Sequence, residues 1–134
     1  MADSRKVAFF ANTVSVGHNL KIHQPLTFGN VITNVGNSYH KETGMFLCTV
    51  PGYYAFSANV LVDAGNTIRT TIVKNGSVMQ QIYSGDPAKN SNGGATIVLH
   101  VKPGDLVWVR LETTDGPHAI DWESNFTGFL LYKD

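Results

Sequence analysis

The chain has 134 residues, a formal charge of +0 from ten basic and ten acidic side chains, and a composition that is 43% hydrophobic and 15% charged. These values predict one globular domain and argue against both a disordered chain and a basic nucleic-acid-binding surface. We therefore expect no nucleic-acid partner. No apolar run reaches the roughly 20 residues of a membrane span, so we expect no membrane insertion, and MADSRKVAFF lacks the apolar segment of a signal peptide.

The run MFLCTV at 45–50 predicts a strand that is apolar on both faces. Cys48, the only cysteine, shares a face with Phe46 and Val50 in this strand. On an apolar face a free thiol behaves as a small hydrophobic group, and its raised pKa makes it a poor nucleophile. We therefore interpret Cys48 as buried scaffold rather than as a nucleophile on an exposed loop.

A β-hairpin follows at 67–83. The runs TIRTTIVK (67–74) and SVMQQIY (77–83) alternate, are rich in β-branched residues, and flank Asn75-Gly76. A type I′ turn needs positive φ at both central residues, and Asn-Gly is the dipeptide that adopts this conformation most readily.

Three more strands are predicted at 94–101, 106–111 and 126–132, the first two on either side of the turn KPGD at 102–105. No window shows a capped repeat of 3.6 residues, and 13 glycines with five prolines punctuate the chain at short intervals. The fold class predicted is therefore all-β, an antiparallel two-sheet sandwich.

Some of these strands are apolar on both faces. In LVWVRL at 106–111, one face carries Val107, Val109 and Leu111, and the other carries Leu106, Trp108 and Arg110. A strand of a two-sheet sandwich normally has one polar face unless something covers it. We expect a partner subunit to be the cover.

Several segments together resemble the globular-head domain of complement subcomponent one-q, within the tumour-necrosis-factor-like jelly rolls. They are AFFAN, TGMFLCTVPGYYAF, FSANVLV, TIVKNG, VKPGDLVWVRL and SNFTGFLLYKD, joined by an N-x-G-x-x-Y segment at Asn34, Gly36 and Tyr39. The resemblance runs from about residue 7 to the end, so 7–134 are assigned to the head and 1–6 to an N-terminal tail.

The resemblance implies a jelly roll with neighbouring termini that packs as a homotrimer and acts as a recognition module rather than an enzyme. The candidates for the trimer interface are Tyr39, Trp108, Arg110 and Phe129. No Gly-X-Y stalk precedes Val7, so we expect a head-only chain. Some relatives hold calcium near the trimer apex, but the hairpin turn here is Asn75-Gly76 and the nearest acid is Asp63. The sequence therefore does not support calcium or another metal.

Ligand binding is expected in two loops, because loops on a rigid β scaffold usually carry the binding residues. The candidates are Asp86, Asn90 and Asn92 in segment 84–94, and Asp115, His118, Asp121, Trp122 and Glu123 in segment 113–125. Sugars are recognised by planar hydrogen-bonding groups and an aromatic face, and Asp121-Trp122-Glu123 has that composition. The alternatives are that these loops are simply solvated and that Trp122 plugs the edge of the sandwich.

The function predicted is a secreted, lectin-like pattern-recognition protein of innate immunity that binds microbial or cell-surface glycans. The alternative is a cytokine-like trimeric ligand that docks a protein receptor in a groove between subunits. A hydrolase that uses Cys48 or a His–Asp pair is a third class, and no H-x-H, HExxH or G-x-S-x-G spacing supports it.

Overall fold

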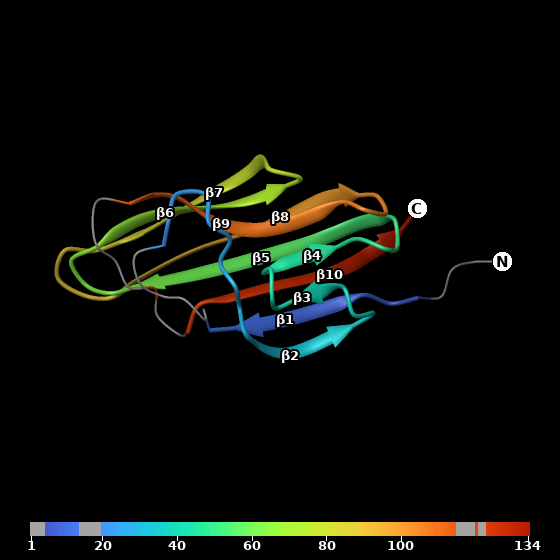
Figure 1. Ribbon diagram of the computed structural model, residues 1–134, viewed down its shortest axis with the longest axis horizontal. Coiled ribbons are helices and arrows are strands. Elements are labelled where there is room, and N and C mark those ends of the chain that lie inside the picture. The colour runs from blue at the N-terminus through green and yellow to red at the C-terminus, as the bar shows by residue number, and fades with distance from the viewer. Residues whose placement is uncertain (1–4, 14–19, 115–119, 121–122) are drawn as a thin grey trace.

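The computed structural model describes residues 5–13, 20–114, 120 and 123–134. Ten strands form two antiparallel sheets packed face to face (Figure 1). The strands are β1 (Ala8–Asn12), β2 (Asn30–Val35), β3 (Tyr39–His40), β4 (Met45–Leu47), β5 (Gly52–Val62), β6 (Thr67–Lys74), β7 (Ser77–Gly85), β8 (Ser91–Val101), β9 (Leu106–Thr114) and β10 (Asn125–Lys133). No helix in this part of the chain is long and apolar enough to cross a membrane.

The first sheet has the order β2-β1-β10-β5-β8, and the second has the order β3-β4-β9-β6-β7. Both sheets mix strands from distant parts of the sequence, and their pairing is antiparallel throughout. This arrangement is a jelly roll, so the predicted fold class is confirmed. The C-terminus lies at one end of the sandwich beside the start of β1, where the Leu130 amide donates to the Val7 carbonyl at 3.0 Å.

The predicted hairpin is confirmed as β6 and β7. Asn75 has φ 52° and Gly76 has φ 85°, as a type I′ turn requires. The other predicted turn, at 102–105, joins strands of different sheets, because β8 lies in the first sheet and β9 in the second. The Asp105 carboxylate accepts hydrogen bonds from the Lys102 amide at 2.9 Å and the Asn75 side-chain amide at 3.0 Å, and both lower the pKa of Asp105. The two turns are thereby tied together.

The core between the sheets is rich in aromatic rings. The Phe9 ring centroid lies 5.1 Å from that of Tyr39, 5.7 Å from Phe46 and 5.0 Å from Phe126, in stacked and edge-on geometries that aromatic pairs prefer. Phe46 and Val107 are fully buried on paired positions of β4 and β9, so the inward faces predicted for these strands are confirmed.

Tyr39, which was predicted to lie at the trimer interface, belongs to this core. Its side chain is 3% exposed in a single chain, so a partner subunit has almost none of it left to cover. The hydroxyl accepts from the Phe28 amide at 3.0 Å and donates to the Phe28 carbonyl at 3.2 Å. Burial raises the pKa of Tyr39 to about 12. Tyr39 therefore anchors the segment before β2 to the core.

Two adjacent threonines on β6 allow a matched test of buried hydroxyls. Both are fully buried, but the Thr71 hydroxyl donates to Glu112 Oε1 at 3.0 Å, whereas the described residues offer the Thr70 hydroxyl no partner. An unpaired buried hydroxyl costs about 1 kcal/mol or more, and a typical net hydrogen bond contributes about as much.

We expect Thr70→Val to raise the free energy of unfolding by about 1 kcal/mol and Thr71→Val to lower it by about the same amount. Urea denaturation of the two variants measures the difference, since Val and Thr have nearly the same volume. Shifts of the same sign in both variants would contradict this account of the two hydroxyls.

Candidate functional site

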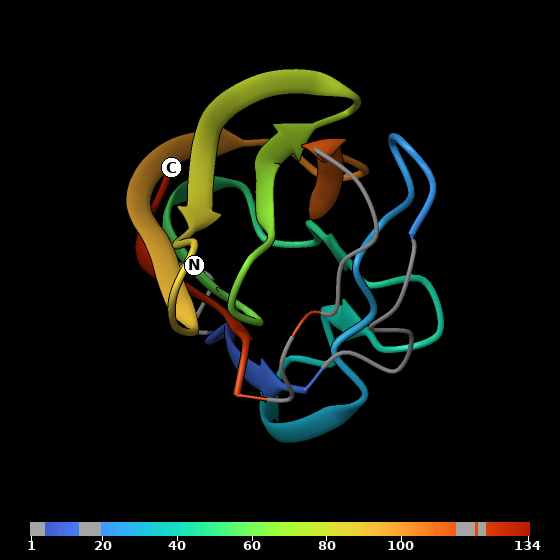
Figure 2. The ribbon, with the colours of Figure 1, turned by 90° about the vertical axis from the view of Figure 1, so that its left-hand side faces the viewer.

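Two connections, 63–66 after β5 and 86–90 after β7, gather at the end of the sandwich opposite the C-terminus (Figure 2, which views this end). Ile120, between β9 and β10 in the sequence, forms an antiparallel bridge with Val62 at the end of β5. Described residues of both segments that were predicted to bind ligand, 86–90 and Ile120, therefore lie at this end, which we call the loop end.

Asp86 and Asn90 hold the loop end together. Asp86 Oδ1 accepts from the amides of Ala88 at 2.8 Å and Lys89 at 3.2 Å, which closes a tight turn. Asn90 Oδ1 accepts from the Ala64 amide at 2.9 Å. The Asn90 contact joins loop 86–90 to loop 63–66, and the Asp86 contacts shape loop 86–90 itself, so both predicted ligand residues also have a structural role.

The other predicted ligand residues separate into two groups. Asn92 lies on β8, and its side-chain amide approaches Asn59 Oδ1 on β5 at 3.5 Å. Glu123 is exposed and precedes Ser124, whose hydroxyl accepts from the Leu61 amide at 2.9 Å. The remaining candidates, Asp115, His118, Asp121 and Trp122, lie outside the described residues.

A surface hollow of about 180 Å³ lies next to the loop end, on the outer face of the second sheet. It is lined by Thr67, Ile68, Arg69, Tyr83, Thr113 and Thr114. The Arg69 guanidinium lies 5.2 Å from the centroid of the Tyr83 ring, within the range of a cation–π contact. The sequence reading did not single out any of these residues.

The hollow depends on a one-residue shift in the register between β6 and β7, which the sequence pattern does not reveal. The Asn75-Gly76 turn pairs Lys74 with Ser77, a register that, continued without interruption, would place Ile82 opposite Arg69. A bulge between Ile72 and Val73 shifts the register and brings Tyr83 opposite Arg69 instead. Bulge positions do not follow from alternation alone, so the hollow could not be predicted from the sequence pattern.

A polar cluster adjoins the hollow on the same face. Glu112 accepts from Arg110 Nε at 3.1 Å and from the Thr71 hydroxyl at 3.0 Å, and it lies 3.2 Å from His23 Nε2. Burial raises the pKa of Glu112, but the hydrogen bonds from these three side chains outweigh it and lower the pKa overall. Arg110, a predicted interface residue, is therefore already paired within its own chain.

The outer face of the first sheet carries an apolar row across five strands. Strand pairing places Val35, Ala8, Phe129, Ala55 and Val98 side by side on β2, β1, β10, β5 and β8. Phe129 is 43% exposed in a single chain. We call this row the apolar row; an exposed patch of this kind on a sheet face is typical of a surface that a partner covers.

Trp108 lies on the opposite outer face of the molecule, on β9 in the second sheet. It is partly exposed and pairs with Met45 on β4 and Val73 on β6. Trp108 and Phe129 therefore belong to different surfaces and cannot form one continuous patch. This separation is compatible with a ring assembly, in which two different surfaces of each subunit meet.

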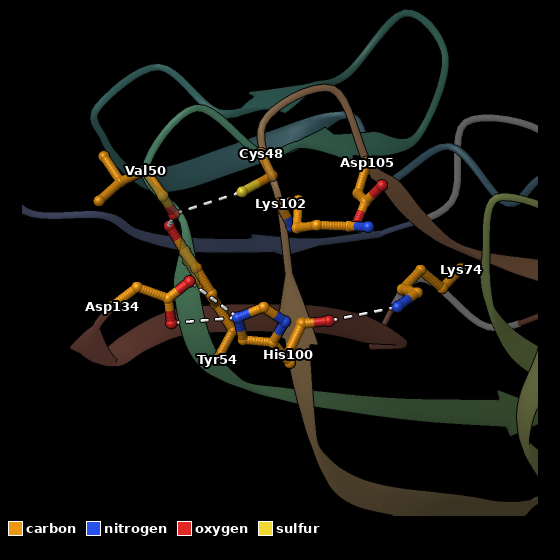
Figure 3. Close-up of polar contacts among 8 residues, drawn as sticks. All are labelled: Cys48, Val50, Tyr54, Lys74, His100, Lys102, Asp105 and Asp134. Atoms are coloured by element: carbon orange, nitrogen blue, oxygen red, sulfur yellow. Dashed lines mark hydrogen bonds and ion pairs between the residues drawn. The ribbon is translucent and has the colours of Figure 1, made fainter.

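Cys48 is buried scaffold in the structure (Figure 3). Its side chain is 1% exposed, and Sγ donates to the Val50 carbonyl at 3.3 Å, which also accepts from the Tyr54 hydroxyl at 2.7 Å. Burial, reinforced by the negative charge of Asp105, raises the pKa of Cys48 to about 11. The interpretation of Cys48 as a packing residue is confirmed.

We expect the Cys48 thiol to react slowly with a thiol reagent in the native protein. A pKa of about 11 leaves roughly one thiol in ten thousand ionised at neutral pH, and the reagent must also reach a buried atom. Labelling is timed by mass spectrometry, with the protein in denaturant as the control. Equal rates in the two conditions would contradict the assignment.

The described residues contain no group of three His, Cys, Asp or Glu side chains placed to hold a metal ion. His100 Nε2 lies 2.9 Å from the Asp134 carboxylate (Figure 3). The His100 ring lies 4.9 Å from that of Tyr53. This His–Asp pair sits on an exposed sheet face, where each side chain remains well exposed. The geometry is that of a surface ion pair, not of a nucleophile and its base.

Comparisons with known proteins match the chain to one domain family. A model of the C1q domain matches residues 8–131. Human and rat proteins called complement C1q tumor necrosis factor-related protein 5 are each 36% identical over 116 residues, which cover 82% of this chain and 47% of each relative. The chain thus spans about half the length of the curated relatives it matches.

Solved structures show the same similarity in three dimensions. The globular domain of zebrafish complement 1qA protein has a TM-score of 0.77 at 25% identity, over 97% of this chain and 100% of that chain. Eiger TNF from S. frugiperda has a TM-score of 0.74 at 15% identity, over 97% of this chain and 95% of that chain. At that identity the second similarity concerns the fold alone.

Proposed function

The chain belongs to the C1q domain family, and from this premise we propose that it is an extracellular recognition module that assembles as a homotrimer and binds microbial or cell-surface glycans. The apolar row on the first sheet is the observation that carries the assembly in this proposal. A monomer would leave Phe129 and Val98 in contact with water, whereas a second subunit would remove them from it.

Binding, rather than catalysis, is the activity we propose. Cys48, the only thiol, is buried with a raised pKa, and the His100–Asp134 pair lies on an open sheet face. The loop end offers instead the composition of a binding surface, with Asn90 and Glu123 exposed. Three copies of a weak site in one trimer would bind a repetitive polysaccharide far more tightly than a single site would.

The proposal is tested with an array of glycans and microbial polysaccharides, probed with the native protein in the presence and absence of a calcium chelator. Discrete glycan hits are expected. No binding to any glycan on the array, together with tight binding to a protein ectodomain, would instead identify a cytokine-like ligand and would refute the glycan proposal.

Trp122 is the residue that the sequence nominates for stacking on a sugar ring. We therefore include Trp122→Ala on the same array and record its melting temperature. Lost binding at an unchanged melting temperature places the ligand at Trp122. Unchanged binding with a lower melting temperature makes Trp122 a packing residue and moves the proposed site to segment 84–94.

A further inference from the structure

We propose that the hollow around Arg69 and Tyr83 binds the carboxylate of an acidic saccharide, an inference that rests on the proposed glycan-binding function and makes it specific. The hollow measures about 180 Å³, which suits a single sugar ring rather than an extended chain. It lies beside the loop end, at the start of β6 and the end of β9.

Three side chains form a row across the hollow. Strand pairing places Tyr83 on one side of Arg69 and Thr113 on the other, on β7, β6 and β9. Because paired positions of neighbouring strands share a face, all three side chains project from the outer face of the second sheet. The row therefore presents an aromatic ring, a guanidinium and a hydroxyl side by side.

The contact with Tyr83 orients the Arg69 guanidinium. Its central carbon lies 5.2 Å from the ring centroid, and Tyr83 is 53% exposed. A guanidinium that stacks on an aromatic ring keeps its edge N–H groups available as a planar fork, which matches the two oxygens of a carboxylate. Thr113 adds a hydroxyl that can pair with a sugar hydroxyl.

The charge of Arg69 remains available for a ligand. Within the part of the chain that the structure describes, no carboxylate lies at ion-pair distance from Arg69. Glu112, which precedes Thr113, is engaged by Arg110, Thr71 and His23. The hollow is thus lined by one cation and by hydroxyl groups, which together match an anionic sugar better than a neutral sugar or a simple anion.

The test compares two probes that differ only in the carboxylate: a glucuronic acid-terminated oligosaccharide and its glucose-terminated counterpart, displayed on the same carrier. Binding of the native protein is measured by biolayer interferometry. We expect the acidic probe to bind about tenfold or more tightly, and Arg69→Gln to abolish that preference by a loss of roughly 10- to 100-fold.

Matched variants distinguish a specific site at the hollow from nonspecific electrostatic attraction between the protein and the acidic probe. Lys41→Gln removes the same charge from the exposed turn after β3, at the far edge of the second sheet from the hollow, and is expected to keep the preference. Tyr83→Phe should keep it as well, whereas Tyr83→Leu should weaken it, because only the latter removes the ring. Melting temperatures identify any variant that fails to fold, and in that case Arg69→Lys, which keeps the charge but loses the fork, provides the second measurement.

Two further probes identify the source of the charge. The hollow would recognise negative charge alone if polyglutamate bound as well as the acidic oligosaccharide, or if sulfate competed at the same concentration as free glucuronate. Either result would refute the proposal that the ligand is a saccharide. Equal binding of the two oligosaccharides would also refute it. If neutral glycans still bind elsewhere on the array, only this inference fails; if no glycan binds at all, the proposed function fails with it.

Discussion

Phe129→Asp is expected to convert the trimer into monomers that retain the fold. Phe129 sits at the centre of the apolar row, between Ala8 on β1 and Ala55 on β5. A carboxylate placed at a covered apolar contact loses its hydration without gaining a partner, a cost of several kcal/mol that would act at every subunit contact. Sedimentation velocity at micromolar concentration measures the assembly, and circular dichroism measures the fold.

The matched control is Ile22→Asp. Ile22 is also an exposed apolar side chain, 53% accessible, but it lies at a turn beside β9 and not on the first sheet. We expect this variant to remain a trimer. Dissociation of both variants would mean that added charge destabilises the assembly nonspecifically, and a trimer in both would exclude the apolar row as the contact surface.

Gly44→Ala is expected to lower the free energy of unfolding by several kcal/mol, the largest stability change we predict for a single methyl group. Gly44 has φ +77°, and a Cβ there would collide with the backbone carbonyl of Leu26. Backbone cannot move aside as a flexible side chain can. The segment that carries Leu26 pairs with β9 through the Val109 carbonyl, so its displacement would disturb the second sheet.

Gly65→Ala separates backbone strain from this collision. Gly65 has φ +87°, and a Cβ there would meet no atom within 4 Å. Its cost should be limited to the left-handed conformation, about 1 to 2 kcal/mol. Urea denaturation of both variants gives the comparison, and equal losses would contradict a steric role for Gly44.

Much of the fold could be predicted because local chemistry determines it. The Asn75-Gly76 turn fixes one hairpin by its φ requirement, and the strand pattern together with the family resemblance places Phe46 and Cys48 on one buried face. The separation of β8 and β9 into different sheets could not be predicted in this way, because a Pro-Gly turn serves a hairpin and a crossover between sheets equally well.

The site was less predictable, because tertiary contacts determine which partners its side chains have. Asp86 and Asn90 were selected as polar loop residues, yet Asp86 closes the turn that carries it, and Asn90 accepts from the Ala64 amide of the neighbouring loop. Tyr39 was selected for an interface and instead anchors its hydroxyl to Phe28 in the core. The hollow beside Arg69 exists because of a bulge, and a bulge changes which residues face each other without changing the composition of either strand.

Assembly is the claim on which the rest of the account depends, and the mass of the native particle tests it most directly. The chain has a mass of 14.6 kDa, so sedimentation equilibrium at micromolar concentration should give one species of about three times that mass, because the apolar row needs a neighbouring subunit. A single species of 14.6 kDa under the same conditions would show that the row stays exposed to water, and would contradict the account.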